Sequence, residues 1–175
     1  MPIVYLLPGD LHIARQPAII STILGSCISI CLYAPSLRTG AMCHCLLPFS
    51  SEKNGGDQPF KYLDQAIKHM ILKMEEMGIG RNKFFAQIFG GSDMFRNDDS
   101  SESNHVFQRG NGRIPYNSIG KQNIEAARAI LQAYRVPVRK EDLGGYRGRK
   151  IFFHCSTGEV QVKEICSNLA ADKMA

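Results

Sequence analysis

The sequence predicts one α/β domain in which short strands alternate with two helices. The chain has 175 residues, of which 44% are hydrophobic and 21% charged, a composition typical of a globular protein with a single core. Short runs rich in β-branched residues indicate strands, whereas two longer stretches repeat apolar residues at steps of three and four, as amphipathic helices do. We find no internal repeat and no linker, so we expect a single domain over residues 1–175.

The first part of the chain is predicted to form strands. Four segments have this pattern: 11–15, 18–22, 28–33 and 41–47. The last two flank a turn, so residues 28–47 are expected to form a hairpin. Residues 17–37 carry no charge and lie between Arg15 and Arg38, a pattern that a membrane span would also show. Serine, threonine and glycine interrupt this stretch, which favours two buried strands broken at Gly25-Ser26 and no membrane insertion.

The second part of the chain contains both expected helices. An apolar stripe over residues 60–77, followed by Gly78, predicts the first helix. The second should run from residue 118 or 123 to 134. Residues 96–113 have the composition of a long polar loop. The remaining strands are expected at 83–89, 136–141, 150–155 and 160–165, the last two as a hairpin.

Charge and cysteine content restrict the class of protein. The net charge is +5 and the pI is near 8.9, an excess that suits an acidic partner. The chain has no long block of Lys and Arg, so we predict no nucleic-acid binding. Six cysteines without a preceding signal peptide indicate reduced thiols in a cytoplasmic protein.

One thiol has a position suited to nucleophilic chemistry. Cys27 follows Gly25 and Ser26 between two apolar strands, where a tight turn can expose the thiol and direct backbone N–H groups at an oxyanion. His44 lies on the returning strand of the expected hairpin, close enough by strand pairing to activate the thiol. A hydroxyl five or six residues before the thiol, on Thr22 or Ser21, could orient the ring or the substrate.

Two other interpretations of these residues remain open. The thiol and the imidazole could simply be buried structural side chains, since cysteine is among the most buried residue types. They could also belong to a metal site, because Cys27, Cys31, Cys43, His44 and Cys45 offer five ligands within 19 residues. Strand alternation argues against a metal, since it turns Cys43 and Cys45 away from His44.

Several short motifs occur in a fixed order along the chain. They are Leu24-Gly25-Ser26-Cys27, Gly40-Ala41-Met42-x-His44-x-Leu46-Leu47-Pro48, Lys61-Tyr62-x-Asp64, Gly90-Gly91, Ile119-Gly120-x-x-Asn123-x-Glu125-Ala126 and Glu141-Asp142-x-Gly144-Gly145. Together they resemble the pattern of the CheD family, the chemoreceptor glutamine deamidases of bacterial and archaeal chemotaxis. The resemblance covers about residues 10–165, which we therefore expect to be the core of the domain.

The resemblance implies a cysteine hydrolase that converts receptor glutamine side chains to glutamate, with methylesterase activity in some members. The nucleophile of the family falls on Cys27 and its histidine on His44, while its threonine falls on Thr22 or Ser21, depending on a shift of one residue. No metal or organic cofactor is implied. The expected fold resembles the cytotoxic-necrotizing-factor type of cysteine hydrolase, a sandwich of mixed sheets with helices packed outside. The implied partners are chemoreceptors and a CheC-type phosphatase, and the alternative function is a non-catalytic adaptor that binds either of them.

Overall fold

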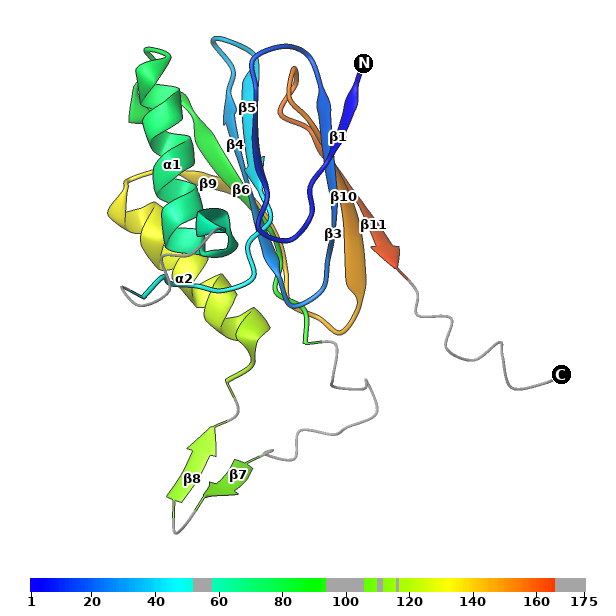
Figure 1. The fold of residues 1–175 in the computed structure, drawn as a ribbon, viewed down its shortest axis with the longest axis vertical. Coiled ribbons are helices and arrows are strands. Elements are labelled where there is room, and N and C mark those ends of the chain that lie inside the picture. The colour runs from blue at the N-terminus through cyan, green and yellow to red at the C-terminus, as the bar shows by residue number, and fades with distance from the viewer. Residues whose placement is uncertain (52–57, 94–105, 110–111, 116, 166–175) are drawn as a thin grey trace, which may run out of the picture.

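The protein is a sandwich of two β-sheets with two helices packed on the outer face of one of them (Figure 1). The computed structural model describes residues 1–51, 58–93, 106–109, 112–115 and 117–165. The five-stranded sheet has the order β2 (Leu11–Ala14), β5 (Thr39–Cys43), β4 (Ile28–Ala34), β6 (Phe85–Gly90) and β9 (Val138–Leu143). The four-stranded sheet has the order β1 (Ile3–Tyr5), β3 (Ile19–Leu24), β10 (Gly148–His154) and β11 (Val160–Ile165). The long helices are α1 (Leu63–Glu76) and α2 (Ile119–Ala133), and the shorter elements are the 3₁₀ turns η2 (Pro59–Lys61) and η3 (Arg81–Lys83) and the paired strands β7 (Val106–Arg109) and β8 (Gly112–Pro115).

Both large sheets are mixed. β1 runs parallel to β3 and β6 runs parallel to β9, while the other neighbours in these two sheets are antiparallel. This confirms the predicted class, a mixed α and β protein with two main helices. The hairpins expected at 28–47 and 150–165 are also confirmed, as β4 with β5 and β10 with β11.

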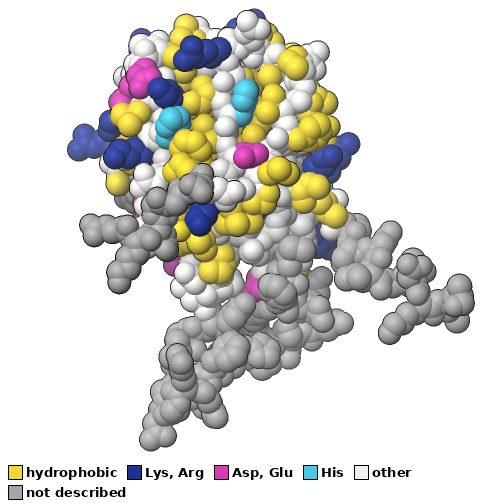
Figure 2. All heavy atoms as spheres, in the orientation of Figure 1, with side chains coloured by type: hydrophobic (Ala, Val, Ile, Leu, Met, Phe, Trp, Pro, Cys, Tyr) yellow, Lys and Arg dark blue, Asp and Glu magenta, His cyan; other side chains and the backbone are white. Residues whose placement is uncertain are grey.

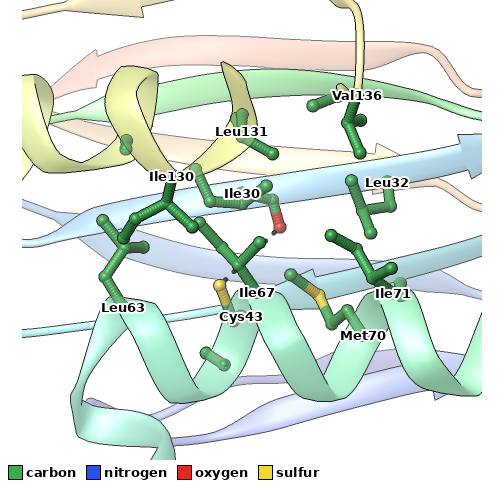
Figure 3. Close-up of a cluster of buried hydrophobic side chains, with 14 of the residues drawn as sticks. Ile30, Leu32, Cys43, Leu63, Ile67, Met70, Ile71, Ile130, Leu131 and Val136 are labelled. Carbon is green, nitrogen blue, oxygen red and sulfur yellow. Dashed lines mark hydrogen bonds between the residues drawn. The ribbon is translucent and has the colours of Figure 1, made fainter. Parts of the chain in front are cut away.

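The core has two layers, which explains why β4 is buried along its whole length. Every residue of β4 is buried, because one face of the strand packs on the helices and the other packs on the second sheet. Figure 3 shows the helix side, where Ile30 and Leu32 of β4 meet Ile67 and Ile71 of α1. On the opposite face of the five-stranded sheet, side chains of both sheets interdigitate: Cys31, Tyr33, Met42 and Phe89 from one, and Ile20, Leu24, Ile151 and Phe153 from the other.

The structure corrects several boundaries. β1 was not predicted, because residues 3–5 have no neighbouring pattern to mark them and they pair only with the distant β3. The strand predicted at 41–47 ends at Cys43; Cys45 still bridges Ile28, and from Leu46 on the backbone bonds the Lys61 carbonyl instead. The second helix begins at Ile119 with Ser118 as its N-cap, whose side chain accepts a hydrogen bond from the Lys121 N–H at 3.2 Å.

Two further predictions concern the uncharged stretch and the polar segment. The uncharged stretch forms strands β3 and β4, and no helix among the described residues is long and apolar enough to cross a membrane. Within the polar segment 96–113, predicted as a loop, residues 106–109 and 112–113 instead belong to the paired strands β7 and β8. Residues 96–105 and 110–111 of that segment lie outside the described residues.

Candidate active site

The turn that carries Cys27 takes the chain from one sheet to the other. β3 ends at Leu24 in the four-stranded sheet, and β4 begins at Ile28 in the five-stranded sheet. The predicted break at Gly25-Ser26 is therefore a crossover between layers, which brings the thiol to the end of the sandwich. Cys27 is half-buried and packs against the layer between the sheets.

The backbone of this turn is fixed from the side of β6. The Ser92 N–H donates to the Gly25 carbonyl and the Gly91 N–H donates to the Cys27 carbonyl, both at 2.8 Å. Gly90 has φ +112°, and a Cβ built on it would overlap the Cys27 carbonyl oxygen, so only glycine fits there. Among the described residues, no backbone carbonyl accepts a hydrogen bond from the N–H of Ser26 or Cys27. The oxyanion site expected at this turn stays a prediction.

His44 lies on the same face as Cys27. It follows the last residue of β5, and its backbone N–H donates to the Asp10 carbonyl at 2.9 Å. The pairing of β4 with β5 continues at the bridge between Ile28 and Cys45, which sets His44 opposite Ser29. Cys27 directly precedes β4 and packs against the layer between the sheets, the side to which Thr22 and His44 also belong. Pairing continued by one residue beyond Ile28 would make Cys27 a diagonal neighbour of His44, at a spacing of about 7–8 Å.

A threonine hydroxyl determines which nitrogen of His44 carries the proton. Thr22 Oγ1 lies 2.7 Å from His44 Nδ1, and the same hydroxyl donates to the Leu6 carbonyl at 2.8 Å. A hydroxyl has one proton, so Thr22 must accept from Nδ1–H. In the neutral ring Nε2 is then the unprotonated nitrogen, and this atom is buried with no partner among the described residues. His44 is thus held as the tautomer whose free lone pair can act as a base.

Burial keeps both groups neutral. It raises the pKa of the Cys27 thiol above its ordinary value, and the backbone N–H of Cys27 offsets only part of this rise. Burial lowers the pKa of His44, with the Leu6 carbonyl and then the Asp10 carboxylate acting in the opposite direction. Near neutral pH the resting pair is therefore a thiol and an uncharged imidazole, and a proton must pass between them before the sulfur can attack a carbonyl.

The structure separates the two candidate hydroxyls. Thr22 points into the sandwich toward His44, whereas Ser21 lies opposite Phe152 on the other face of β3. Ser21 is fully buried, and its hydroxyl has no partner among the described residues. Sequence reasoning missed the Leu6 carbonyl, which anchors Thr22. The sequence feature that could have indicated it is the apolar run 3–7, which forms β1 and continues through Leu6.

The ligand types considered for a metal site do not converge. Cys43 and Cys45 pack in the cluster between the five-stranded sheet and the helices, on the face away from Thr22 and His44, as strand alternation predicts. The described residues contain no group of three or more His, Cys, Asp or Glu side chains that could hold a metal ion.

A half-buried thiol and a neutral, hydrogen-bonded imidazole are the two groups that a base-activated thiol nucleophile needs, and that role for Cys27 and His44 stays a prediction. Comparison with known proteins then identifies the family. The family model for CheD, described as CheD chemotactic sensory transduction, matches residues 46–164. That match begins after Cys27 and His44, so it does not test the roles expected for these two residues.

Relatives match along nearly the whole chain. The chain is 36% identical over 165 residues to a probable chemoreceptor glutamine deamidase CheD 2 of Geobacter sulfurreducens, covering 94% of this chain and 91% of that protein. It is 35% identical over 158 residues to a probable chemoreceptor glutamine deamidase CheD of Thermococcus kodakarensis, covering 90% and 89%. The corresponding protein of Archaeoglobus fulgidus is 36% identical over 156 residues, covering 89% and 88%. The chain belongs to the CheD family.

Proposed function

We propose that this protein is a chemoreceptor glutamine deamidase, which hydrolyses particular glutamine side chains of chemoreceptors to glutamate and ammonia. The relatives carry that description, and the chain matches each of those described above over nine-tenths or nearly so of its length. The observation that carries the chemistry is the Thr22–His44 contact, which leaves His44 Nε2 as a free base on the face of the sheet that Cys27 also occupies.

In the first half of the reaction, His44 Nε2 takes the proton of the Cys27 thiol and the sulfur attacks the glutamine Cδ carbonyl. The N–H groups of Ser26 and Cys27 stabilise the negative charge that develops on the carbonyl oxygen. The imidazolium then gives its proton to the leaving nitrogen. Ammonia departs and a thioester remains on Cys27.

In the second half, water replaces the ammonia. The water oxygen attacks the thioester carbonyl while neutral His44 accepts a proton from that water. His44 then gives this proton to the Cys27 sulfur when the thioester breaks. The products are glutamate and the free thiol. A glutamyl methyl ester would pass through the same thioester, with methanol as the leaving group, so methylesterase activity on the same sites is part of the proposal.

The net positive charge favours encounter with an acidic partner. On the face that Figure 2 shows, Lys and Arg side chains lie in separate groups with hydrophobic side chains between them. The net charge of +5 favours approach to acidic receptor helices, and this attraction weakens as salt rises.

Three finer points belong to this proposal. The fold is of the cytotoxic-necrotizing-factor type, as a two-sheet sandwich with a thiol at a crossover turn suggests. The chain acts as a single cytoplasmic domain over residues 1–175, with its core at about 10–165. A CheC-type phosphatase binds it, which titration calorimetry with the purified phosphatase would test.

The decisive experiment is mass spectrometry of a chemoreceptor cytoplasmic fragment incubated with the purified protein. Wild type should convert specific glutamines to glutamates, while Cys27→Ser and His44→Ala should not. His69→Ala is the matched control for the histidine, because His69 lies on α1 and stacks on Phe60 at 4.8 Å between ring centroids. Binding of several receptor fragments without conversion would refute the deamidase and favour the adaptor.

A further inference from the structure

A fully buried amide on α2 connects the two segments that carry the thiol and the imidazole. Asn123 Nδ2 donates to the Ser26 carbonyl at 3.1 Å and to the Leu46 carbonyl at 3.0 Å. Ser26 directly precedes Cys27, and Leu46 comes two residues after His44. Both neighbours are carbonyl oxygens, so only the NH₂ end of the amide can occupy this position.

We propose that Asn123 is a positioning residue for the site, which holds the Cys27 turn and the segment after His44 at the spacing that proton transfer requires. The Ser26 carbonyl is the middle one of three consecutive carbonyls, and the other two are bound by Ser92 and Gly91 on the β6 side. With all three fixed, the peptide units of the turn cannot rotate, and the N–H groups of Ser26 and Cys27 keep one direction. The proposal rests on the deamidase function proposed above.

The first turn of α2 is itself held in place, so Asn123 has a rigid base. A Cβ built on Gly120 would overlap the Gly91 carbonyl oxygen, and a Cβ on Gly91 would lie 2.6 Å from Ile124 Cγ1. The helix therefore packs directly on the backbone that binds the Cys27 carbonyl. One contact surface joins α2, the end of β6 and the thiol turn, and a shift of Asn123 would move all three.

The other end of the amide has no partner. Asn123 Oδ1 is buried and has no hydrogen-bond partner among the described residues. An unpartnered buried acceptor costs stability, which offsets part of what the two donated bonds contribute. Removal of the amide also leaves the Ser26 and Leu46 carbonyls without this donor, so turnover and thermal unfolding must be compared to distinguish a positioning role from a structural one.

Two variants of the same size test this. Asn123→Asp places an acceptor against the two carbonyls, and Asn123→Leu removes the donors and the unpartnered acceptor together. With the receptor fragment as substrate, we expect kcat to fall about tenfold or more in both, because both lose the two hydrogen bonds that Asn123 Nδ2 donates, with KM nearly unchanged. In Asn123→Asp the loss should lessen as the pH falls and the carboxyl gains a proton to donate. Asn117→Asp, an exposed change just before α2, is the matched control and should behave as wild type.

Thermal unfolding and the alkylation of Cys27 by iodoacetamide complete the test. A folded Asn123→Leu protein with wild-type kcat would overturn the proposal, and so would unfolding of both variants, which would make the amide a structural residue. If wild type shows no deamidation, the proposed function fails. The alkylation profile then decides the positioning role separately, because a displaced Cys27 turn should change the pH dependence of alkylation in both variants and not in Asn117→Asp.

Discussion

Thr22→Val replaces the hydroxyl that orients His44 with a methyl group of the same shape. It leaves two buried groups without a partner, the Leu6 carbonyl and the Nδ1–H of His44. Each such group costs about 1–3 kcal/mol, so the free energy of unfolding should fall by at least about 2 kcal/mol. For a chain of this length that lowers Tm by about 4–8 °C. The ring also loses its preferred orientation, and about 1–3 kcal/mol of lost positioning corresponds to a fall in kcat of about 5- to 150-fold.

The assay is the initial rate of glutamine conversion in the receptor fragment, measured by mass spectrometry alongside thermal unfolding by circular dichroism. Thr22→Ser keeps the hydroxyl and should retain kcat within a few-fold of wild type. Ser21→Ala removes the neighbouring hydroxyl on the opposite face of β3 and should leave kcat unchanged. If Thr22→Val has wild-type kcat, or if Ser21→Ala loses as much activity as Thr22→Val, the assignment of Thr22 is wrong.

Three further predictions follow from the same geometry. Because burial raises the pKa of Cys27 and lowers that of His44, kcat/KM should form a plateau whose acidic limb lies below pH 6.5 and whose alkaline limb lies above pH 9.0. Iodoacetamide should alkylate Cys27 faster as the pH rises through the alkaline limb, whereas rapid alkylation at pH 5 would indicate a preformed thiolate instead. Gly78→Ala should lower the free energy of unfolding by about 1–2 kcal/mol, because its positive φ alone disfavours alanine. Gly90→Ala should lower Tm further and abolish turnover, since the added Cβ also overlaps the Cys27 carbonyl oxygen. Equal Tm losses in the two variants would contradict this. Arg149 is buried and donates to Asp142, to the Gly144 carbonyl and, at 3.1 Å, to Ser92 Oγ. A lysine cannot make all of these bonds, so Arg149→Lys should lower the free energy of unfolding by about 1–3 kcal/mol. An unchanged Tm would show that these bonds add nothing to stability.

Local patterns were sufficient for much of the fold. The apolar stripe of α1 and the hairpin of β10 with β11 depend on residues close together in the chain, and each was predicted near its observed bounds. For α2, one of the two predicted starting residues, 118, lies next to the observed start at Ile119. The thiol after Gly25-Ser26 and the histidine on the returning strand were also visible, because a glycine turn and a strand pairing are short-range features. β1 could not be predicted from local sequence, because a strand of three residues is stabilised mainly by pairing with β3, which is distant in the chain.

The sequence by itself determined both long helices, most strands of the two large sheets and where a nucleophile could lie, but not β1, β7 or β8. Only the tertiary structure decided that β3 and β4 belong to different sheets, that Thr22 rather than Ser21 meets His44, and that Asn123 lies behind Cys27. These choices depend on contacts between residues 16 to 97 positions apart. A strand shifted by one residue exchanges its two faces, so the identity of the hydroxyl that reaches the ring follows from the register of distant strands and not from local sequence.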